Sequence, residues 1–265
     1  MHERAFAFAL STFLLAPAAA SAGWYARQTE RATPAGGTAQ EMRSEIYYEN
    51  GKMRVDQGER STIIYDLRAG RFTMLSHPDK VYLSQSVEEM MVMREQILVQ
   101  AKAQLAKLPP EARPAAEAQL KQIEGRQTEA ARPKPTGKSA KHGSFACEIY
   151  TWTGEEDDGE VCLSQKTGVD LADFTRDTTA LSEKLVRLGG GKAAGLAMLE
   201  TARFGFPVYT KRTLKMSGRD VATESQLLEI KAMKVPADRF DVPKGYSLKT
   251  IPNGPGMRAA PPPGP

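Results

Sequence analysis

Apolar and polar residues alternate along the first part of the chain that follows residue 22. The alternation runs through residues 42–48 and resumes over residues 52–56, with Asn50-Gly51 between the two segments. Both residues of this pair tolerate the positive φ angles of a type I′ turn, so the pattern predicts a β-hairpin. Similar short strands are predicted over residues 23–31, 62–67, 71–75 and 80–83. Because the connections are short, we expect an antiparallel meander.

After residue 85 the apolar positions repeat about every 3.6 residues, which predicts a helix. Ser86 and Glu89 have the spacing of a capping box, in which each side chain accepts a hydrogen bond from the other residue's backbone N–H. Apolar side chains line one stripe of this helix, yet Val92, Met93 and Val99 lie off the stripe. We expect a helix that is apolar nearly all round to be covered on two sides.

The predicted helical insertion extends over residues 86–124, and Pro109-Pro110 separates its two helices. Residues 125–141 are polar and show no periodicity, so they predict a mobile linker. The rest of the chain predicts a hairpin over residues 144–164, helices over 170–188 and 192–203, and strands over 208–216 and 221–233. Residues 252–265 are rich in Pro and Gly and predict a disordered tail, which leaves residues 23–251 as a single α+β domain.

Residues 1–22 have the pattern of a cleaved signal peptide. Arg4 precedes an apolar run that ends at Leu15, and small residues follow up to Ala22. The run is shorter than the roughly twenty apolar residues of a transmembrane helix. Cleavage is expected after Ala22, with Ala20 as the alternative, and no cysteine stands nearby to accept a lipid. We therefore expect a periplasmic or secreted protein without a transmembrane segment.

The charge of the chain bears on its partners. The 36 Lys and Arg residues against 32 Asp and Glu residues give a net charge of +4, and the basic residues are scattered rather than clustered. A nucleic-acid-binding protein usually carries a dense basic patch, so no nucleic-acid partner is expected. Contact with anionic lipid head groups stays open.

The chain has 2 cysteines, Cys147 and Cys162, within the predicted hairpin. In an oxidising compartment such a pair predicts a disulfide, worth roughly 3 kcal/mol in the chain-entropy account. A redox pair and a metal site are the alternatives, but the spacing is not C-x-x-C and the sequence shows no histidine cluster. Direct pairing of the two cysteines would centre the turn on Gly154-Glu155, whereas the composition centres it two residues later. A bulge or a diagonal bridge would reconcile the two.

Other candidate motifs predict structure rather than chemistry. The glycines before Lys192 resemble a phosphate loop, but Ala193 stands where Ser or Thr is required, so a helix stop is favoured. The acidic residues 155–158 could hold calcium, although four adjacent acids are typical of a solvated turn. After residue 22 the chain has only His77 and His142, at unrelated positions, and it lacks G-x-S-x-G. We therefore expect no enzyme, no metal site and no cofactor.

Methionines gather where the meander meets the helix. Met74 lies on a predicted strand, and the helix begins with Met90, Met91 and Met93. Methionine is flexible and polarisable, which suits an apolar surface that accepts variable ligands, although it also fills gaps in ordinary cores. The candidate ligand-binding residues are Met74, Met90, Met91, Met93, Ile97 and Leu98.

Several short phrases, taken in order, resemble a known family. They are Tyr47-Tyr48-Glu-Asn-Gly-Lys-Met-Arg54, Ile63-Ile-Tyr-Asp-Leu67, Lys80-Val-Tyr82, the cysteine hairpin and Phe240-Asp-Val-Pro-Lys-Gly-Tyr246. The chain resembles a family of secreted bacterial domains of unknown function, which is similar in turn to the LolA/LolB-like fold of outer-membrane lipoprotein carriers and receptors. The resemblance implies an α+β fold with a strongly curved antiparallel sheet, an unclosed barrel, and helices on its concave face.

In the carrier proteins the hollow of this fold receives acyl chains, so the resemblance implies a non-enzymatic periplasmic protein that binds a lipid, an acyl chain or another apolar ligand. The helical insertion departs from the compact carriers and leaves open whether the hollow is accessible. The alternative is an envelope protein-interaction or sensor module whose cavity is filled by its own helices. A hydrolase with an unrecognised site is a third hypothesis.

Overall fold

The computed structural model describes residues 23–117, 120, 133–154, 157–185, 201–216 and 219–249. Several predicted features therefore lie outside the described residues: the signal peptide, the glycines before Lys192 and the tail over residues 252–265. The predicted helix over residues 192–203 is described only at residues 201–203. Within the part of the chain that is described, no helix combines the length and the apolar character needed to cross a membrane.

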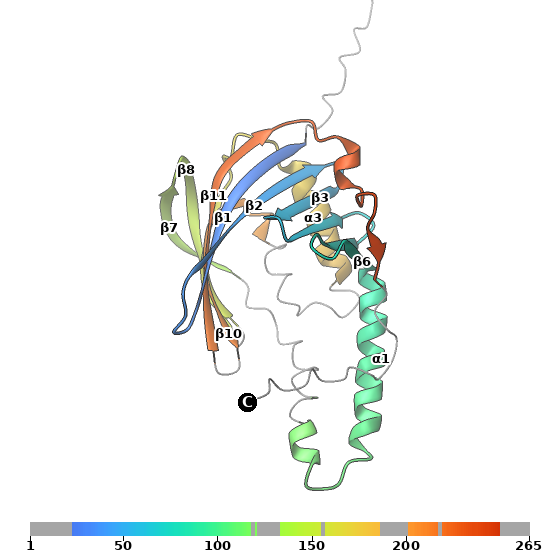
Figure 1. Ribbon diagram of the computed structural model, residues 1–265. Helices are drawn as coiled ribbons and strands as arrows, with labels where there is room; N and C mark the ends of the chain where they lie inside the picture. Colours follow the sequence, from blue (N-terminus) through green and yellow to red (C-terminus); the bar gives the residue numbers. More distant parts are fainter. Residues whose placement is uncertain are drawn as a thin grey trace, which may run out of the picture.

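The described strands form one large sheet of 12 strands, in the order β12-β6-β5-β4-β3-β2-β1-β11-β10-β9-β8-β7. The sheet is open, since β12 and β7 lie at opposite ends of this order, and Figure 1 shows that it is strongly curved. Its strands are antiparallel except for β12, which runs parallel to β6. The predicted open, curved, antiparallel sheet is confirmed. The strands are β1 (Trp24–Pro34), β2 (Gln40–Glu49), β3 (Lys52–Gln57), β4 (Ser61–Asp66), β5 (Arg71–Ser76), β6 (Val81–Ser86), β7 (Lys134–His142), β8 (Phe145–Thr153), β9 (Asp157–Ser164), β10 (Phe206–Met216), β11 (Arg219–Ala232) and β12 (Ser247–Leu248).

The hairpin between β2 and β3 forms as the Asn-Gly pair predicts. Asn50 and Gly51 have φ angles of 50° and 81°, and Glu49 pairs with Lys52 across the turn. A Cβ at Gly51 would also lie 2.6 Å from Nε of Arg68, so any larger residue there would displace that side chain. This turn fixes the register of the meander that follows.

The first strand joins the two halves of the sheet. β1 pairs with β2 along one edge and with β11 along the other, so that Ala26 lies between Ile46 and Ile230. A backbone hydrogen bond from the N–H of Met233 to the carbonyl of Gly23 extends this contact to the end of β11. Strands from opposite ends of the sequence therefore meet at the centre of one sheet.

The structure contradicts the predicted linker over residues 134–141, because β7 occupies Lys134–His142 and pairs with β8. Lys, Pro and Gly in this segment do not produce the apolar alternation of a central strand. β7 lies at an edge of the sheet, where lysine and proline are tolerated and even favoured, and its pairing is irregular between Pro135 and Ser139. Over residues 134–141 the linker prediction was therefore wrong, because an edge strand carries little apolar signal. The first part of the predicted linker, residues 125–132, lies outside the described residues.

Helix α3 (Ala172–Leu185) packs against one face of the sheet. Phe174 and Leu181 join the core cluster that contains Trp24 and Tyr48, and the ring of Phe174 meets the ring of Trp24 edge-on at 5.3 Å. The face of the sheet that contacts this helix is called the α3 face below.

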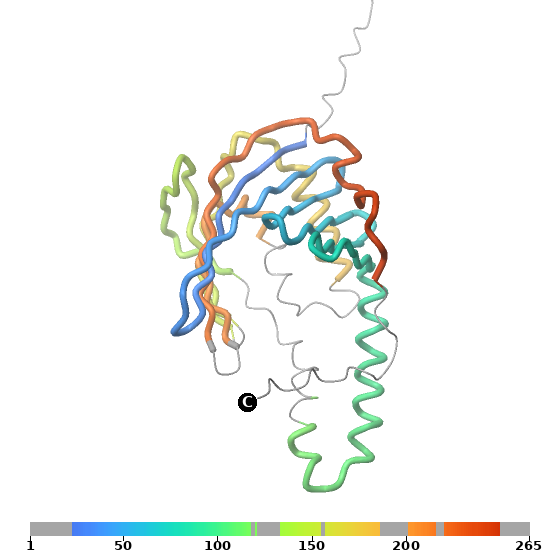
Figure 2. Tube along the Cα trace, in the orientation of Figure 1, coloured from blue at the N-terminus to red at the C-terminus, as the bar shows by residue number. Residues whose placement is uncertain are grey.

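Helix α1 (Val87–Leu105) leaves the sheet after its first turn (Figures 1 and 2). Its start is held by the predicted capping box of Ser86 and Glu89, and Val87 is the buried residue of the helix. Val92 and Val99 remain 55% and 62% exposed. The expectation that this helix is covered on two sides is therefore wrong, because its later turns extend beyond the sheet rather than along it.

The end of the described chain crosses the opposite face of the sheet. We call residues 235–249 the C-terminal strap; it contains the 3-10 helix η2 (Ala237–Phe240) and β12. Val235 and Phe240 pack against Ile64 and Leu75 in a second core cluster. The meander strands are therefore covered by the strap on this face.

Candidate functional site

The α3 face carries a continuous line of apolar side chains across the meander. In antiparallel strands, residues that lie directly opposite one another point to the same face. The register aligns one residue from each of six neighbouring strands in this way, and we call this set the aliphatic row: Ala26, Ile46, Val55, Ile63, Met74 and Leu83. A single surface therefore runs from the centre of the sheet at β1 to β6.

The burial of the aliphatic row changes along its length. Ala26 and Ile46 are 0% and 9% exposed, whereas Met74 is 45% exposed. Between these ends, Val55 and Ile63 are half-buried. The row thus begins inside the core beside α3 and reaches the exposed Met74, which solvent or a ligand can contact, before its last member, the half-buried Leu83.

A second row of side chains, which we call the aromatic row, lies beside the first on the same face. Its members also lie directly opposite one another, and each is two residues away from the member of the aliphatic row on the same strand. They are Trp24, Tyr48, Met53, Tyr65 and Phe72. Trp24 stacks on Tyr48 at 5.5 Å, and Phe206 meets Trp24 edge-on. The indole Nε1 of Trp24 is buried without a hydrogen-bond partner within the described part of the chain. A buried donor of this kind is costly, and an acceptor brought by a ligand or a water molecule would relieve it.

One buried carboxylate lies at the edge of this aromatic row. Asp177 of α3 accepts hydrogen bonds from the Tyr48 hydroxyl at 2.8 Å, from Nε of Arg68 at 3.1 Å and from the guanidinium of Arg176 at 3.1–3.2 Å. Burial of the phenol, together with its hydrogen bond to Asp177, raises the pKa of Tyr48 well above its usual range. The tyrosine therefore stays protonated, and the carboxylate is occupied as an anchor between α3 and the sheet.

A polar chain on the opposite face joins the sheet to the C-terminal strap. The hydroxyl of Thr62 contacts Asp56 Oδ1 at 2.5 Å and Nε2 of His77 at 2.9 Å, and Nδ1 of that histidine lies 2.6 Å from the hydroxyl of Tyr246. A hydroxyl beside a histidine is the pairing that nucleophilic catalysis uses, but Thr62 is fully buried, out of reach of a substrate. The arrangement holds the strap on the sheet. Sequence reasoning placed His77 in a turn and had no local signal for its partner 169 residues away.

The structure separates the predicted ligand-binding residues into two groups. Met74 lies in the aliphatic row, and Met91 packs against the core cluster from the first turns of α1. Met90, Met93 and Leu98 are half-buried and Ile97 is exposed along the part of α1 that leaves the sheet. Val55, Ile63 and Leu83 were missed, although the alternation of the meander and the Asn-Gly turn together contain the signal for them.

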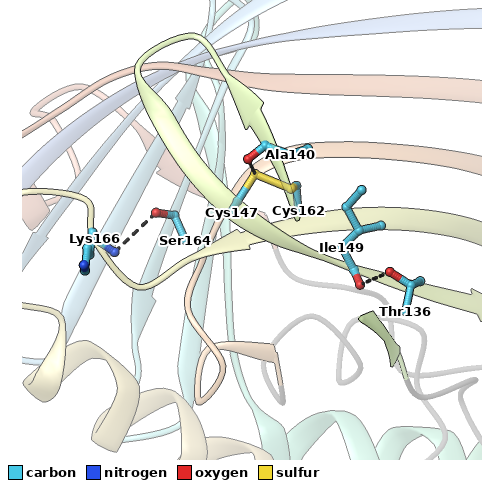
Figure 3. The surroundings of a disulfide bond; sticks show 7 residues. All are labelled: Thr136, Ala140, Cys147, Ile149, Cys162, Ser164 and Lys166. Atoms are coloured by element: carbon cyan, nitrogen blue, oxygen red, sulfur yellow. Dashed lines mark hydrogen bonds between the residues drawn. A yellow bond between two sulfur atoms is a disulfide. The ribbon is translucent and has the colours of Figure 1, made fainter. Parts of the chain in front are cut away.

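Cys147 and Cys162 form the predicted disulfide between β8 and β9 (Figure 3). Cys162 lies directly opposite Ile149, so the bridge is diagonal. Of the two arrangements that could reconcile the turn with the bridge, the diagonal one is therefore confirmed. His142 of β7 lies beside the disulfide, and the three residues place one ligand atom each within 4.8 Å of one another. The spacing of His142 from the two cysteines does not predict this proximity.

The acidic turn over residues 155–158 is described only in its second half. Asp157 forms an ion pair of 2.6 Å with Arg212, and Asp158 forms one with Lys215. Both carboxylates thus have cationic partners on the neighbouring strand β10. These contacts favour a charged surface turn over a calcium site.

Sequence comparison finds no match among curated proteins. Similarity to solved structures is distant. A structure of PNGF-II is 10% identical with a TM-score of 0.39, and the match covers 86% of this chain but only 30% of that one. A LolA superfamily protein from Nitrosomonas europaea is 8% identical with a TM-score of 0.29, covering 83% and 90%. A domain from Vibrio parahaemolyticus assigned to outer-membrane lipoprotein sorting is 9% identical with a TM-score of 0.32, covering 83% and 89%.

A family profile gives a more direct assignment. The family described as a domain of unknown function, DUF4412, matches residues 88–246, which is more than half of the chain. The match begins in the first turn of α1 and ends within the C-terminal strap. It confirms the sequence-based expectation of a family of domains of unknown function, and this chain belongs to the DUF4412 family.

Proposed function

We propose that this protein is a non-enzymatic, extracytoplasmic binding protein for an apolar ligand, such as a lipid or an acyl chain. The observation that carries the proposal is the aliphatic row, whose side chains pass without interruption from the buried Ala26 to the exposed Met74. An acyl chain laid along this row would extend the apolar core.

The energetics favour a ligand of this class. Burying a methylene group contributes about 0.8 kcal/mol, so a chain of several methylenes needs only a modest apolar surface for stable binding. Contiguous exposed apolar surface is uncommon on proteins unless it serves an interaction. Methionine at the accessible end of the row can adapt its side chain to ligands of different shape.

The two helices would flank the ligand. In our proposal α3 fills the concave side of the sheet over Trp24 and Tyr48, and the portion over β3 to β6 receives the ligand. Met91 already contacts the core beside this portion. Met90, Met93, Ile97 and Leu98 would then contact the part of the ligand that extends past the sheet.

Two features support the proposed compartment. Residues 1–22 have the pattern of a signal peptide, and the disulfide between Cys147 and Cys162 is of a kind that persists outside the cytoplasm. We propose a periplasmic or secreted location on these grounds. An envelope location also supplies the lipids that the proposed site would bind.

The test uses two surface variants with matched exposure. Met74 in the aliphatic row and Leu228 at a bulge in β11 are each 45% exposed. The purified protein should yield lipid on organic extraction, and the delipidated protein should bind a fluorescent fatty acid. Met74→Lys should weaken that binding, whereas Leu228→Lys should leave it unchanged. A delipidated protein that neither yields nor rebinds an acyl probe would contradict the proposal, as would equal binding by the two variants.

A second candidate function is that of an envelope protein-interaction or sensor module. The exposure of Val92 and Val99 on the part of α1 that leaves the sheet favours it. In this case a photocrosslinker at position 99 should capture one defined envelope protein in intact cells, and Val92→Lys should abolish that crosslink. The delipidated protein should then bind no fatty acid. Loss of probe binding without any crosslink would support neither candidate.

A further inference from the structure

Three strands at one end of the sheet bring one histidine and two cysteines together. His142, Cys147 and Cys162 come from β7, β8 and β9, and their ligand atoms lie within 4.8 Å of one another. Figure 3 shows the bridge between the two cysteines, with Ala140 of β7 beside it. The oxygen of Ala140 lies 3.7 Å from Sγ of Cys147, so β7 is packed closely against the sulfur atoms.

The histidine ring is held in place by a fourth strand. It stacks flat on the ring of Tyr209, with the centroids 4.0 Å apart and the planes 5° apart. Tyr209 of β10 lies directly opposite Cys162, and its hydroxyl donates a 3.0 Å hydrogen bond to Glu224. The imidazole is therefore fixed beside the sulfur atoms before any ligand binds.

We infer that the reduced form of this cluster binds a zinc-like metal ion, with the thiolates of Cys147 and Cys162 and the imidazole of His142 as ligands. Two thiolates and one imidazole are a donor set that zinc accepts, with a fourth position left open. Bond lengths of about 2.3 Å to sulfur and about 2.0 Å to nitrogen place such ligand atoms roughly 3–4 Å apart. Once the S–S bond is broken, small side-chain movements give this spacing.

The disulfide and the metal exclude one another. The S–S bond accepts two electrons and two protons from a dithiol, which is itself oxidised to a disulfide, and two thiols result. The metal ion then displaces one proton from each thiol, and a ring nitrogen of His142 contributes a lone pair. In the oxidised form neither sulfur is a thiolate. The cluster would therefore report the redox state of its surroundings as a bound or released metal ion.

The inferred centre and the apolar ligand site lie on different strands, although Cys147 and Cys162 share one core cluster with Ala26. Strands β7 to β9 lie at one end of the strand order, and the aliphatic row extends from β1 toward the other end. Cys147 and Cys162 are buried, whereas His142 is half-buried, so the metal would approach from the side of the histidine.

The test compares the oxidised and the reduced forms of the full chain. After reduction with a dithiol and anaerobic removal of the reductant, thiol counting should find both cysteines free. Competition with a chromophoric chelator should then show one Zn²⁺ bound per reduced chain and none per oxidised chain. Co²⁺ should give a thiolate charge-transfer absorption in the reduced form alone.

Two histidine variants separate ligation from packing. His142→Phe keeps a flat ring against Tyr209 but removes the ligand nitrogen, and should weaken Zn²⁺ binding by the reduced chain roughly tenfold or more. His77→Gln, far from the cluster, should bind Zn²⁺ as the original chain does. Equal affinity in reduced His142→Phe, or equal binding by the oxidised form, would overturn the inference. If reduction unfolds the chain, Zn²⁺ should restore its near-UV circular dichroism, and failure to do so would also overturn it.

Discussion

The hydroxyl of Tyr48 on β2 donates a 2.8 Å hydrogen bond to the carboxylate of Asp177 on α3, 129 residues away. The carboxylate is buried and also accepts from Arg68 and Arg176. This contact fastens the helix to the sheet beside the aromatic row. The geometry of the α3 face therefore depends on one buried polar interaction as well as on apolar packing.

Removing this anchor should destabilise the protein. Asp177→Ala leaves the buried Tyr48 hydroxyl without an acceptor and should lower the free energy of unfolding by about 1–3 kcal/mol. Tyr48→Phe keeps the carboxylate paired with its two arginines and should cost about 1 kcal/mol. Urea denaturation measures both values. The double variant tests whether Tyr48 and Asp177 are coupled. If its decrease in the free energy of unfolding equals the sum of the two single decreases, the two side chains are not coupled.

Alkaline pH should destabilise the fold through its tyrosines. Burial and a hydrogen bond to Glu45 raise the pKa of Tyr47 to about 12, and burial and Glu224 raise the pKa of Tyr209 to about 12. Both shifts start from a usual value of 10.0. Because the folded state holds the neutral phenol, this contribution to stability is complete below pH about 10 and is lost as the pH rises toward 12.

Tyrosinate absorbance during a pH titration measures this effect. The native protein should ionise later than the same chain in urea, and stability from denaturant melts should fall above pH about 10. Tyr209→Phe provides the control, because it removes one late-titrating group without touching Tyr47. Native and denatured chains with superimposed titration curves would contradict the prediction.

The disulfide should stabilise the oxidised protein. It closes a loop with a sequence separation of 15, for which the chain-entropy account gives about 3 kcal/mol. Replacing both Cys147 and Cys162 with serine should lower the free energy of unfolding by roughly that amount. The comparison is made in urea with the original oxidised chain, and with its reduced form as a second reference. A loss smaller than about 1 kcal/mol would show that the hairpin is held by its strand pairing alone.

Helix α1 should show a sharp contrast between its first turn and its later turns. Val87 is buried, and Val87→Ala should destabilise the protein by about 1–2 kcal/mol. Val92 and Val99 are exposed, so Val92→Lys and Val99→Lys should each change stability by less than about 0.5 kcal/mol. Thermal melts of the three variants would decide this. A lysine variant as unstable as Val87→Ala would mean that α1 packs along its whole length.

Local patterns in the sequence predicted the parts of the fold that depend on short-range chemistry. The Asn50-Gly51 turn, the capping box at Ser86 and the disulfide all form as expected. β7 was missed because lysine and proline at a sheet edge lack apolar alternation. The pairing of β1 with β11 could not be predicted either, because contacts between residues some two hundred positions apart leave no local trace.

The same distinction between short-range patterns and contacts of distant residues applies to the candidate sites. Met74 was named as a candidate because of its residue type, whereas the contact of Val55 with Ile63 could be assigned only once the register of their strands was known. His142 could not be assigned to the cysteines from spacing, since its position depends on an unexpected strand and on stacking against Tyr209. Residue type was readable from the sequence, but the juxtaposition of residues from different strands required the fold.

The C-terminal strap should detach more readily than the sheet unfolds. Its described contacts include the small cluster around Phe240, the contact of Tyr246 with His77, the ion pair of Arg239 with Asp56 and the hydrogen bond from the Val235 N–H to Glu49. Backbone hydrogen bonds also run from Ser247 to Lys80 and from Lys249 to Tyr82 of β6. Phe240→Ala removes a buried aromatic ring from that cluster, which in a large core would cost about 3–5 kcal/mol. Here the strap can open while the rest of the domain stays folded. The lost stability should therefore appear first as faster amide exchange within the strap.

Hydrogen exchange measured by mass spectrometry tests this local opening. In Phe240→Ala, peptides covering residues 235–249 should exchange faster, while peptides of β1 and β2 keep the original protection. Phe174→Ala on α3 is the matched control, because it removes the same ring from the opposite face of the sheet and should not selectively expose the strap. Uniform acceleration over the sheet in Phe240→Ala would show instead that strap and sheet unfold together. The polar chain from Asp56 through the buried Thr62 to His77 would then belong to the cooperative core, because its contact with the strap could break only when the sheet itself opens.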